Sequence, residues 1–208
     1  MSVFITFEGG EGSGKSSQAR ALYRTLLRQS ISVILIHEPG STPLGEKLSR
    51  LLKHHRDIQI SPISELLLFN AARAQLVSEV IRPALEKGTV VICDRFTDST
   101  IAYQGSGRGL DIKRVVAVND TATGGLKPHL TVLLDIPVEE GLKRKQGKHI
   151  DRFELENIAF HDKVRQGYLA LAKREPRRFL VVDARRDRQT IAGIIQQQVG
   201  RLLKKWMP

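Results

Sequence analysis

The stretch that decides the fold is Gly9-Gly10-Glu11-Gly12-Ser13-Gly14-Lys15-Ser16. It fits the pattern G-x-x-x-x-G-K-[ST], whose glycines let the backbone curl until several N–H groups converge on one anion. An apolar run over residues 3–8 precedes it, and a segment of helical period over residues 16–29 follows it. This strand–loop–helix context predicts a P-loop that binds a nucleoside triphosphate.

The P-loop predicts ATP as phosphoryl donor and Mg²⁺ as cofactor. Lys15 would reach the β- and γ-phosphates, and Ser16 would ligate the metal ion. A second motif, Asp94-Arg95, follows the apolar run over residues 90–94. It suits a Mg²⁺-linked carboxylate, directly or through water, beside a guanidinium that binds phosphate. The expected ATP-binding residues are Gly9, Gly10, Glu11, Gly12, Ser13, Gly14, Lys15, Ser16 and Ser17.

Short apolar runs alternate with longer segments of helical period along the whole chain. The runs are nearly continuous in Val, Ile, Leu and Phe, as in parallel strands covered on both faces. We therefore expect an α/β fold with a doubly wound, five-stranded parallel sheet, one domain over residues 1–208, and ligands at the carboxyl ends of the strands. Expected strands are 3–8, 33–36, 90–94, 131–135 and 179–183; expected helices are 16–29, 44–54, 62–87, 111–119, 138–145, 152–174 and 190–205. Three strands end in acids: Asp94, Asp135 and Asp183.

Composition narrows the class of partner. The 208 residues include 33 Lys and Arg against 22 acids, a formal net charge of +11. That excess of positive charge favours a polyanionic partner, and small molecules with several phosphates are such partners. Because no reader motif is present, we expect no nucleic acid. The apolar runs are too short to span a bilayer and no secretory pattern is visible, so we expect a cytoplasmic protein without a membrane partner. The single cysteine, Cys93, is expected in the core.

Several P-loop classes are excluded by what the chain lacks. It contains no D-x-x-G switch and no N-K-x-D guanine reader, so it is not a typical GTPase. Motor and AAA-type ATPases usually carry adjacent acids where this chain has Asp94-Arg95. A kinase for a pyrimidine nucleotide or a deoxynucleoside stays open at this point, as does a P-loop ATPase that binds nucleic acid, because the charge alone is compatible with each.

The strings around the P-loop resemble thymidylate kinases in their order along the chain. They are Glu38-Pro39-Gly40-Ser41-Thr42, Asp94-Arg95-Phe96, Ser99-Thr100, Ala102-Tyr103-Gln104-Gly105, Gly141-Leu142-Lys143-Arg144 and Asp151-Arg152-Phe153-Glu154. The resemblance implies a nucleoside monophosphate kinase that moves the γ-phosphoryl group of ATP to dTMP, forming dTDP. It also implies a homodimer.

The resemblance further implies roles on the acceptor side. Phe69 and Arg73, four residues apart on one helix face, would stack on thymine and donate to its O4. Arg95 would bind the acceptor's phosphate, while Thr100 would face the base N3 and Tyr103 would crowd the 2′ position. Glu38 would lie beside the acceptor phosphate or pair with Arg95. The expected dTMP-binding residues are Glu38, Phe69, Arg73, Arg95, Thr100, Tyr103 and Gln104.

Residues 143–152 resemble the family's lid, which closes over both phosphates to exclude water. The P-loop interior holds Glu11 and Ser13 but no arginine, and in the subclass that this chain resembles the lid supplies the cations. The expected catalytic residues are Lys15, Arg95, Arg144, Arg152 and Glu11.

Overall fold

All five strands of this computed structural model, which describes residues 3–54, 58–145 and 152–206, belong to one parallel sheet. The strand order is β2-β3-β1-β4-β5, which confirms the doubly wound α/β fold. The central strand β1 therefore delivers the P-loop to the middle of the carboxyl edge. The strands are β1 (Phe4–Glu8), β2 (Val33–His37), β3 (Val90–Asp94), β4 (Leu130–Asp135) and β5 (Phe179–Asp183).

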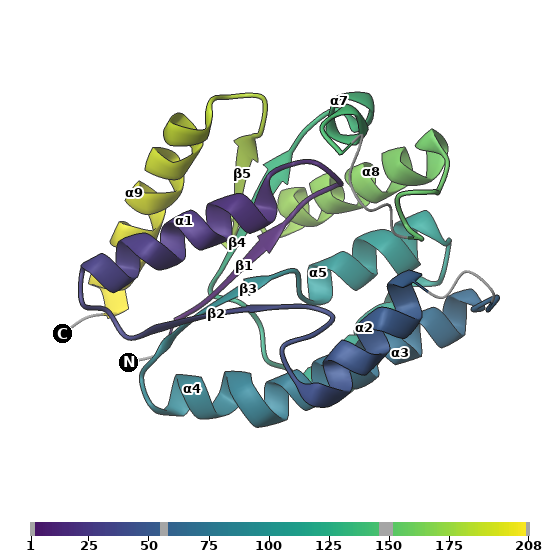
Figure 1. Ribbon diagram of the computed structural model, residues 1–208, viewed down its shortest axis with the longest axis horizontal. Helices are drawn as coiled ribbons and strands as arrows, with labels where there is room; N and C mark the ends of the chain where they lie inside the picture. The colour runs from purple at the N-terminus through teal and green to yellow at the C-terminus, as the bar shows by residue number, and fades with distance from the viewer. Residues whose placement is uncertain (1–2, 55–57, 146–151, 207–208) are drawn as a thin grey trace.

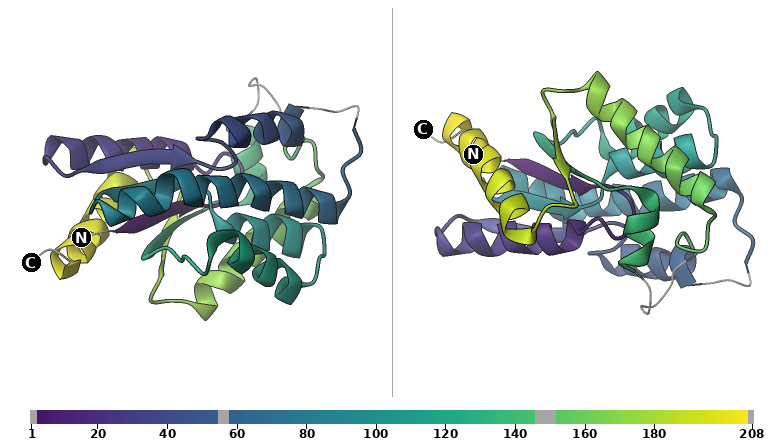
Figure 2. Two further views of the ribbon diagram at one scale, coloured as in Figure 1. Left: turned by 90° about the horizontal axis from the view of Figure 1, so that it is seen from below. Right: turned by 90° about the horizontal axis from the view of Figure 1, so that it is seen from above.

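Helices cover both faces of the sheet (Figures 1 and 2). On one face α1 and α9 pack together, and on the other lie α8 and the long segment that ends in α4. Within the described ranges no helix is long and apolar enough to cross a membrane. The helices are α1 (Lys15–Arg28), α2 (Pro43–His54), α3 (Pro62–Leu76), η1 (Val77–Ile81), α4 (Arg82–Glu86), α5 (Thr97–Thr100), η2 (Ile101–Gly107), α6 (Ile112–Thr123), α7 (Val138–Lys143), α8 (Ile158–Arg174) and α9 (Arg188–Trp206).

Three helical segments differ from the sequence-based expectation. The helix expected over 62–87 contains a π-helical turn, η1, directly before the turn with Pro83, which cannot donate a backbone hydrogen bond. The helix expected from residue 152 begins at Ile158, because the Asn157 side chain caps it by accepting the Phe160 N–H at 2.8 Å. The pair α5–η2, which follows Asp94-Arg95, was not expected.

Apolar strand residues fill the space between the sheet and its helices. Phe7, Ile92 and Val132 pack with α1 and α9 on one face, whereas Phe4 and Cys93 pack with η1 on the other. Cys93 is fully buried, as expected. The continuous apolar pattern of the strands thus arises because both faces are covered.

The last residue of β1, Glu8, ties three elements together although it is fully buried. One carboxylate oxygen accepts the Phe96 N–H at 2.7 Å, and the other accepts the hydroxyls of Ser99 at 2.7 Å and Tyr168 at 2.9 Å. These bonds fix the turn after β3, in which Arg95 adopts a left-handed backbone with φ of 74°. A non-glycine residue there is strained, so Glu8 stabilises a conformation that aims Arg95 at the P-loop.

Because the Glu8 carboxyl is buried, the free energy of unfolding should depend on pH. Burial and the nearby charge of Asp98 raise the pKa of Glu8 from 4.5 to about 7. The folded state therefore binds this proton more tightly than the unfolded chain. The resulting stability is complete below pH 4.5 and is lost as the pH rises through 7. Glu8→Gln, which stays neutral, should gain thermal stability relative to the wild type between pH 5 and pH 8. A difference in melting temperature that does not change with pH would contradict the assignment.

Candidate active site

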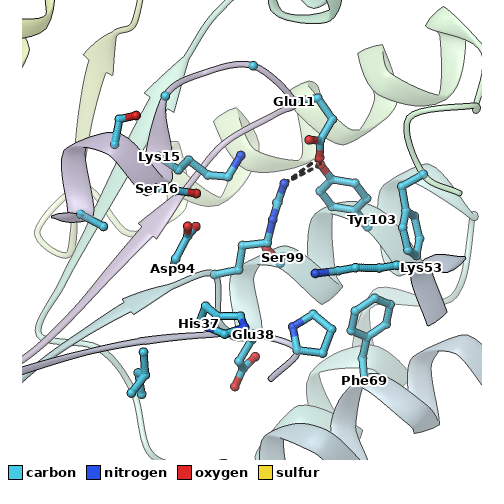
Figure 3. A pocket seen from close by; sticks show the side chains of 18 of the residues that line it. Glu11, Lys15, Ser16, His37, Glu38, Lys53, Phe69, Asp94, Ser99 and Tyr103 are labelled. Atoms are coloured by element: carbon cyan, nitrogen blue, oxygen red, sulfur yellow. Dashed lines mark hydrogen bonds and ion pairs between the residues drawn. The ribbon is translucent and has the colours of Figure 1, made fainter. Parts of the chain in front are cut away.

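A cleft of about 700 Å³ opens at the carboxyl edge of the sheet (Figure 3). Its walls come from the P-loop, the ends of β2 and β3, helix α3, η2 and the segment after α7. Most of the residues expected from the sequence line it: Glu11, Gly12, Gly14, Lys15, Ser16, Ser17, Glu38, Phe69, Arg73, Asp94, Arg95, Thr100, Tyr103, Gln104 and Arg144.

The P-loop is packed closely against the first turns of α7. A Cβ on Gly12, whose φ is 67°, would lie 1.9 Å from the Gly141 carbonyl oxygen, and a Cβ on Gly141 would lie 2.3 Å from the Glu11 carbonyl oxygen. Only glycine permits this approach. Gly9, Gly10 and Ser13 belong to the P-loop but are not among the residues that line the cleft. The Ser13 hydroxyl donates to the Gly10 carbonyl at 2.9 Å within the loop.

Lys15, the first residue of α1, brings a buried cation to the loop. Its Nζ donates to the Gly10 carbonyl at 2.7 Å. Burial, together with the positive charge of Arg95, lowers the pKa of Lys15 to about 8, although Glu11 opposes this shift. Figure 3 shows Lys15, Ser16 and Asp94 on the same side of the cleft.

Arg95 and Glu11 join the P-loop to the turn after β3. The Arg95 Nη2 donates to Glu11 Oε1 at 2.7 Å and to the Tyr103 hydroxyl at 3.2 Å, while that hydroxyl donates to Glu11 at 2.7 Å. Burial alone would raise the pKa of Glu11, but Arg95, Lys15 and Lys145 hold it well below the usual range. Glu11 is therefore an ionised partner of the cations around the phosphate end.

Arg73 is 1% exposed and organises the opposite end of the cleft. Its Nε and Nη2 both lie 2.8 Å from Glu38 Oε2, and its Nη1 donates to Asn119 Oδ1 at 2.8 Å and to Thr100 at 3.1 Å. Nη2 also donates to the Phe96 carbonyl at 3.1 Å. Glu38 thus pairs with Arg73 and not with Arg95. A base oxygen at this end would share or replace one of these acceptors.

The hydrogen bonds of Thr100 determine what its hydroxyl can offer. Thr100 Oγ1 lies 2.8 Å from two acceptors, Asn119 Oδ1 and the Thr97 carbonyl, and it accepts from Arg73. The Asn119 amide has one orientation, because its Nδ2 donates to Thr97 at 3.2 Å and its oxygen faces Arg73. The hydroxyl hydrogen of Thr100 is thereby committed to one of these two oxygens, and the hydroxyl has no hydrogen to donate to a ligand. Asn119 was not foreseen, since no motif marks it.

Among the lining residues to which the sequence assigned no individual role are Lys53, Lys145 and Phe153. Lys53 points from α2 into the cleft (Figure 3), and no motif in the sequence marks its position. Lys145 lies 3.4 Å from Glu11. Phe153 belongs to the string Asp151-Arg152-Phe153-Glu154, which resembles the family. The resemblance could have pointed to Phe153, although no role was expected for it. Its ring centroid is 5.7 Å from that of Phe69.

The structure separates the two expected lid arginines. Arg144 lines the cleft and donates to the Ala184 carbonyl at 2.9 Å. Arg152 instead pairs with Glu65 on α3, so the expectation of a cation at the phosphate end is not met. Its guanidinium is drawn there by a buried carboxylate. Residues 146–151 of the expected lid lie outside the described part of the chain.

Oxygen donors at the phosphate end fit a magnesium ion. Ser16 and Asp94 offer a hydroxyl and a carboxylate on one side of the cleft. Across the described residues no group of three or more His, Cys, Asp or Glu side chains could hold a metal by itself. Magnesium typically takes one or two protein oxygens and completes its shell with phosphates and water. The two other strand-end acids pair elsewhere, Asp135 with Arg165 and Asp183 with Arg185.

Comparisons with known proteins agree with this geometry. The family described as thymidylate kinase matches residues 7–193. A thymidylate kinase of Dehalococcoides mccartyi is 53% identical over 203 residues, covering 98% of both chains. One of Geotalea uraniireducens is 49% identical, covering 97% of this chain and 99% of that protein. The crystal structure of a thymidylate kinase from Ehrlichia chaffeensis has a TM-score of 0.76 at 32% identity, covering 95% of this chain and 98% of that one.

The match extends over nearly the whole chain and includes both walls of the cleft. The protein belongs to the thymidylate kinase family.

Proposed function

We propose that this chain transfers the γ-phosphoryl group of ATP to the phosphate of dTMP, forming dTDP. One observation carries the proposal: a P-loop and a second wall, with Arg95 and a pocket of aromatic and polar side chains, open onto the same cleft. ATP would bind with its phosphates on the P-loop. The pyrimidine of dTMP would lie by Phe69, with its 5′-phosphate toward Arg95.

The chemistry requires charge neutralisation rather than a general base. The second pKa of a phosphate monoester is about 6, so the acceptor is already mostly a dianion at neutral pH. Lys15 and Arg95 would bring two anions together and stabilise the charge on the transferred group. Arg144 and Lys145 lie beside the same space. Ser16 and Asp94 would hold Mg²⁺, which supplies positive charge to the phosphate oxygens when bound.

The base would be selected by what Thr100 can accept. Its hydroxyl hydrogen points to Asn119 or Thr97, so toward a base Thr100 could act only as an acceptor. Thymine N3 carries a hydrogen and suits an acceptor, whereas cytosine N3 is itself an acceptor and would leave two acceptors facing each other.

The molecule would act as a single domain over residues 1–208 and as a homodimer. Exposed apolar side chains on α2, α3 and α6 support the dimer: Leu44 at 42%, Ile63 at 39%, Leu67 at 52% and Val116 at 36%. Helix α3 contacts both α2 and α6, so a second copy could cover one continuous surface. A cytoplasmic location stays a prediction.

Lys15→Ala should lower kcat by roughly 10²- to 10³-fold, because it removes a cation matched to the transition state. ADP release with dTMP and Mg²⁺ measures the effect, and circular dichroism checks the fold. Lys204→Ala, the same change on an exposed position of α9, is the control and should keep wild-type turnover. Turnover of the Lys15 variant close to that of the control would refute the assignment.

A panel of acceptors tests the base pocket. Relative to dTMP, kcat/KM should fall by about 10- to 100-fold for dUMP, which lacks one methyl group, and by at least about 10³-fold for dCMP, which faces Thr100 with an acceptor. Thymidine, which lacks the phosphate, should accept no measurable phosphoryl group. Equal use of dCMP and dTMP would show that Thr100 does not read the base.

Leu67→Lys tests the proposed dimer. The wild type should sediment as a dimer at micromolar concentration, and the variant as a monomer, because the charge would be placed in an apolar interface. A monomeric wild type would refute the proposed dimer. If that monomer phosphorylates dTMP, the proposed reaction still holds.

A further inference from the structure

Arg152 is fixed to the end of α2 rather than directed toward the phosphates. Its Nε donates to the Leu52 carbonyl at 3.1 Å, and its backbone N–H donates to the Lys53 carbonyl at 3.1 Å. The last carbonyls of a helix have no partner within the helix, and a cation there is favourable. Arg152 therefore caps α2 with both its backbone and its side chain.

The same guanidinium contacts Glu65 in the first turn of α3, which is 1% exposed. Arg152 Nη2 lies 2.5 Å from one Glu65 oxygen. Glu65 also accepts from Gln104 at 2.8 Å and from two nitrogens of Arg108 at 3.2 Å. A buried carboxylate needs such compensation, and removal of a partner from it is costly. The position of Arg152 is thus set from two sides.

Phe153 takes its position from this arrangement, because it is the next residue in the chain. The Arg152 guanidinium carbon lies 5.0 Å from the Phe153 ring centroid. The ring is 5% exposed and lines the cleft, with centroids 5.7 Å from Phe69 and 6.0 Å from Tyr103. Arg108 lies 5.8 Å from the same ring. Phe153 therefore completes an aromatic wall with Phe69 and Tyr103.

We propose that Arg152 is a positioning residue, which together with Glu65 holds Phe153 as the third aromatic wall around the acceptor's pyrimidine. The inference rests on the proposed function, because it assigns this end of the cleft to the base. Arg152 acts through Phe153 and does not touch the transferred phosphoryl group.

The experiment measures dTMP binding in the absence of ATP, by isothermal titration calorimetry. Phe153→Ala and Arg152→Ala should each raise the Kd for dTMP by about tenfold, since each removes or releases an aromatic contact. The double variant should bind within about twofold of Phe153→Ala, because both changes act through one ring. Arg201→Ala on α9, an exposed arginine, is the matched control and should bind dTMP as the wild type does.

Steady-state kinetics separates positioning from catalysis. For Arg152→Ala we expect a higher KM for dTMP, a kcat within about threefold of wild type, and an unchanged KM for ATP. An unchanged Kd for dTMP with a kcat lowered by orders of magnitude would overturn the proposal and make Arg152 a catalytic cation. If Arg152→Ala does not fold, Arg152→Lys, which keeps the charge but loses the paired contacts, tests the same split. A wild type without dTMP kinase activity would instead refute the proposed function.

Discussion

The ion pair between Arg95 and Glu11 is the contact on which the arrangement of the cleft depends. It joins the P-loop after β1 to the turn after the neighbouring strand β3, at 2.7 Å and with the Tyr103 hydroxyl bonded to both partners. An ion pair taken out of water is favourable only when its remaining donors are satisfied. Here Arg95 Nη1 finds acceptors in the Gly9 carbonyl and in the hydroxyls of Ser99 and Tyr168. The left-handed backbone of Arg95, held by Glu8, makes this geometry possible.

The cations of the phosphate end each have a protein acceptor within reach. Lys15 donates to the Gly10 carbonyl, Arg95 contacts Glu11, and Lys145 contacts Glu11 and Glu154. An entering phosphate therefore exchanges one acceptor for another, and the site does not bury bare positive charge before the substrates arrive. The base end differs, because Arg73 is held by Glu38 Oε2 and by Asn119, and the Thr100 hydroxyl has no hydrogen left to donate.

The sequence predicted the sheet and the phosphate end because both depend on local patterns. Continuous apolar runs identify buried strands, and the spacing of Gly12, Gly14, Lys15 and Ser16 is set by one loop. It could not predict contacts between distant segments. Lys53 reaches the cleft, and Asn119 reaches Arg73, from helices without a motif. Arg152 pairs with Glu65, a buried carboxylate 87 residues earlier, and not with the phosphate end.

In the proposed reaction, one cleft would hold both phosphates in line between Lys15 and Arg95. A crystal structure with dTMP, Mg²⁺ and a non-hydrolysable ATP analogue tests it most directly. We expect the acceptor's oxygen roughly 3–3.5 Å from the γ-phosphorus, the distance of a near-attack geometry, with an Arg95 nitrogen in contact with the dTMP phosphate. A dTMP phosphate bound away from Arg95, or a pyrimidine far from Phe69, would contradict it.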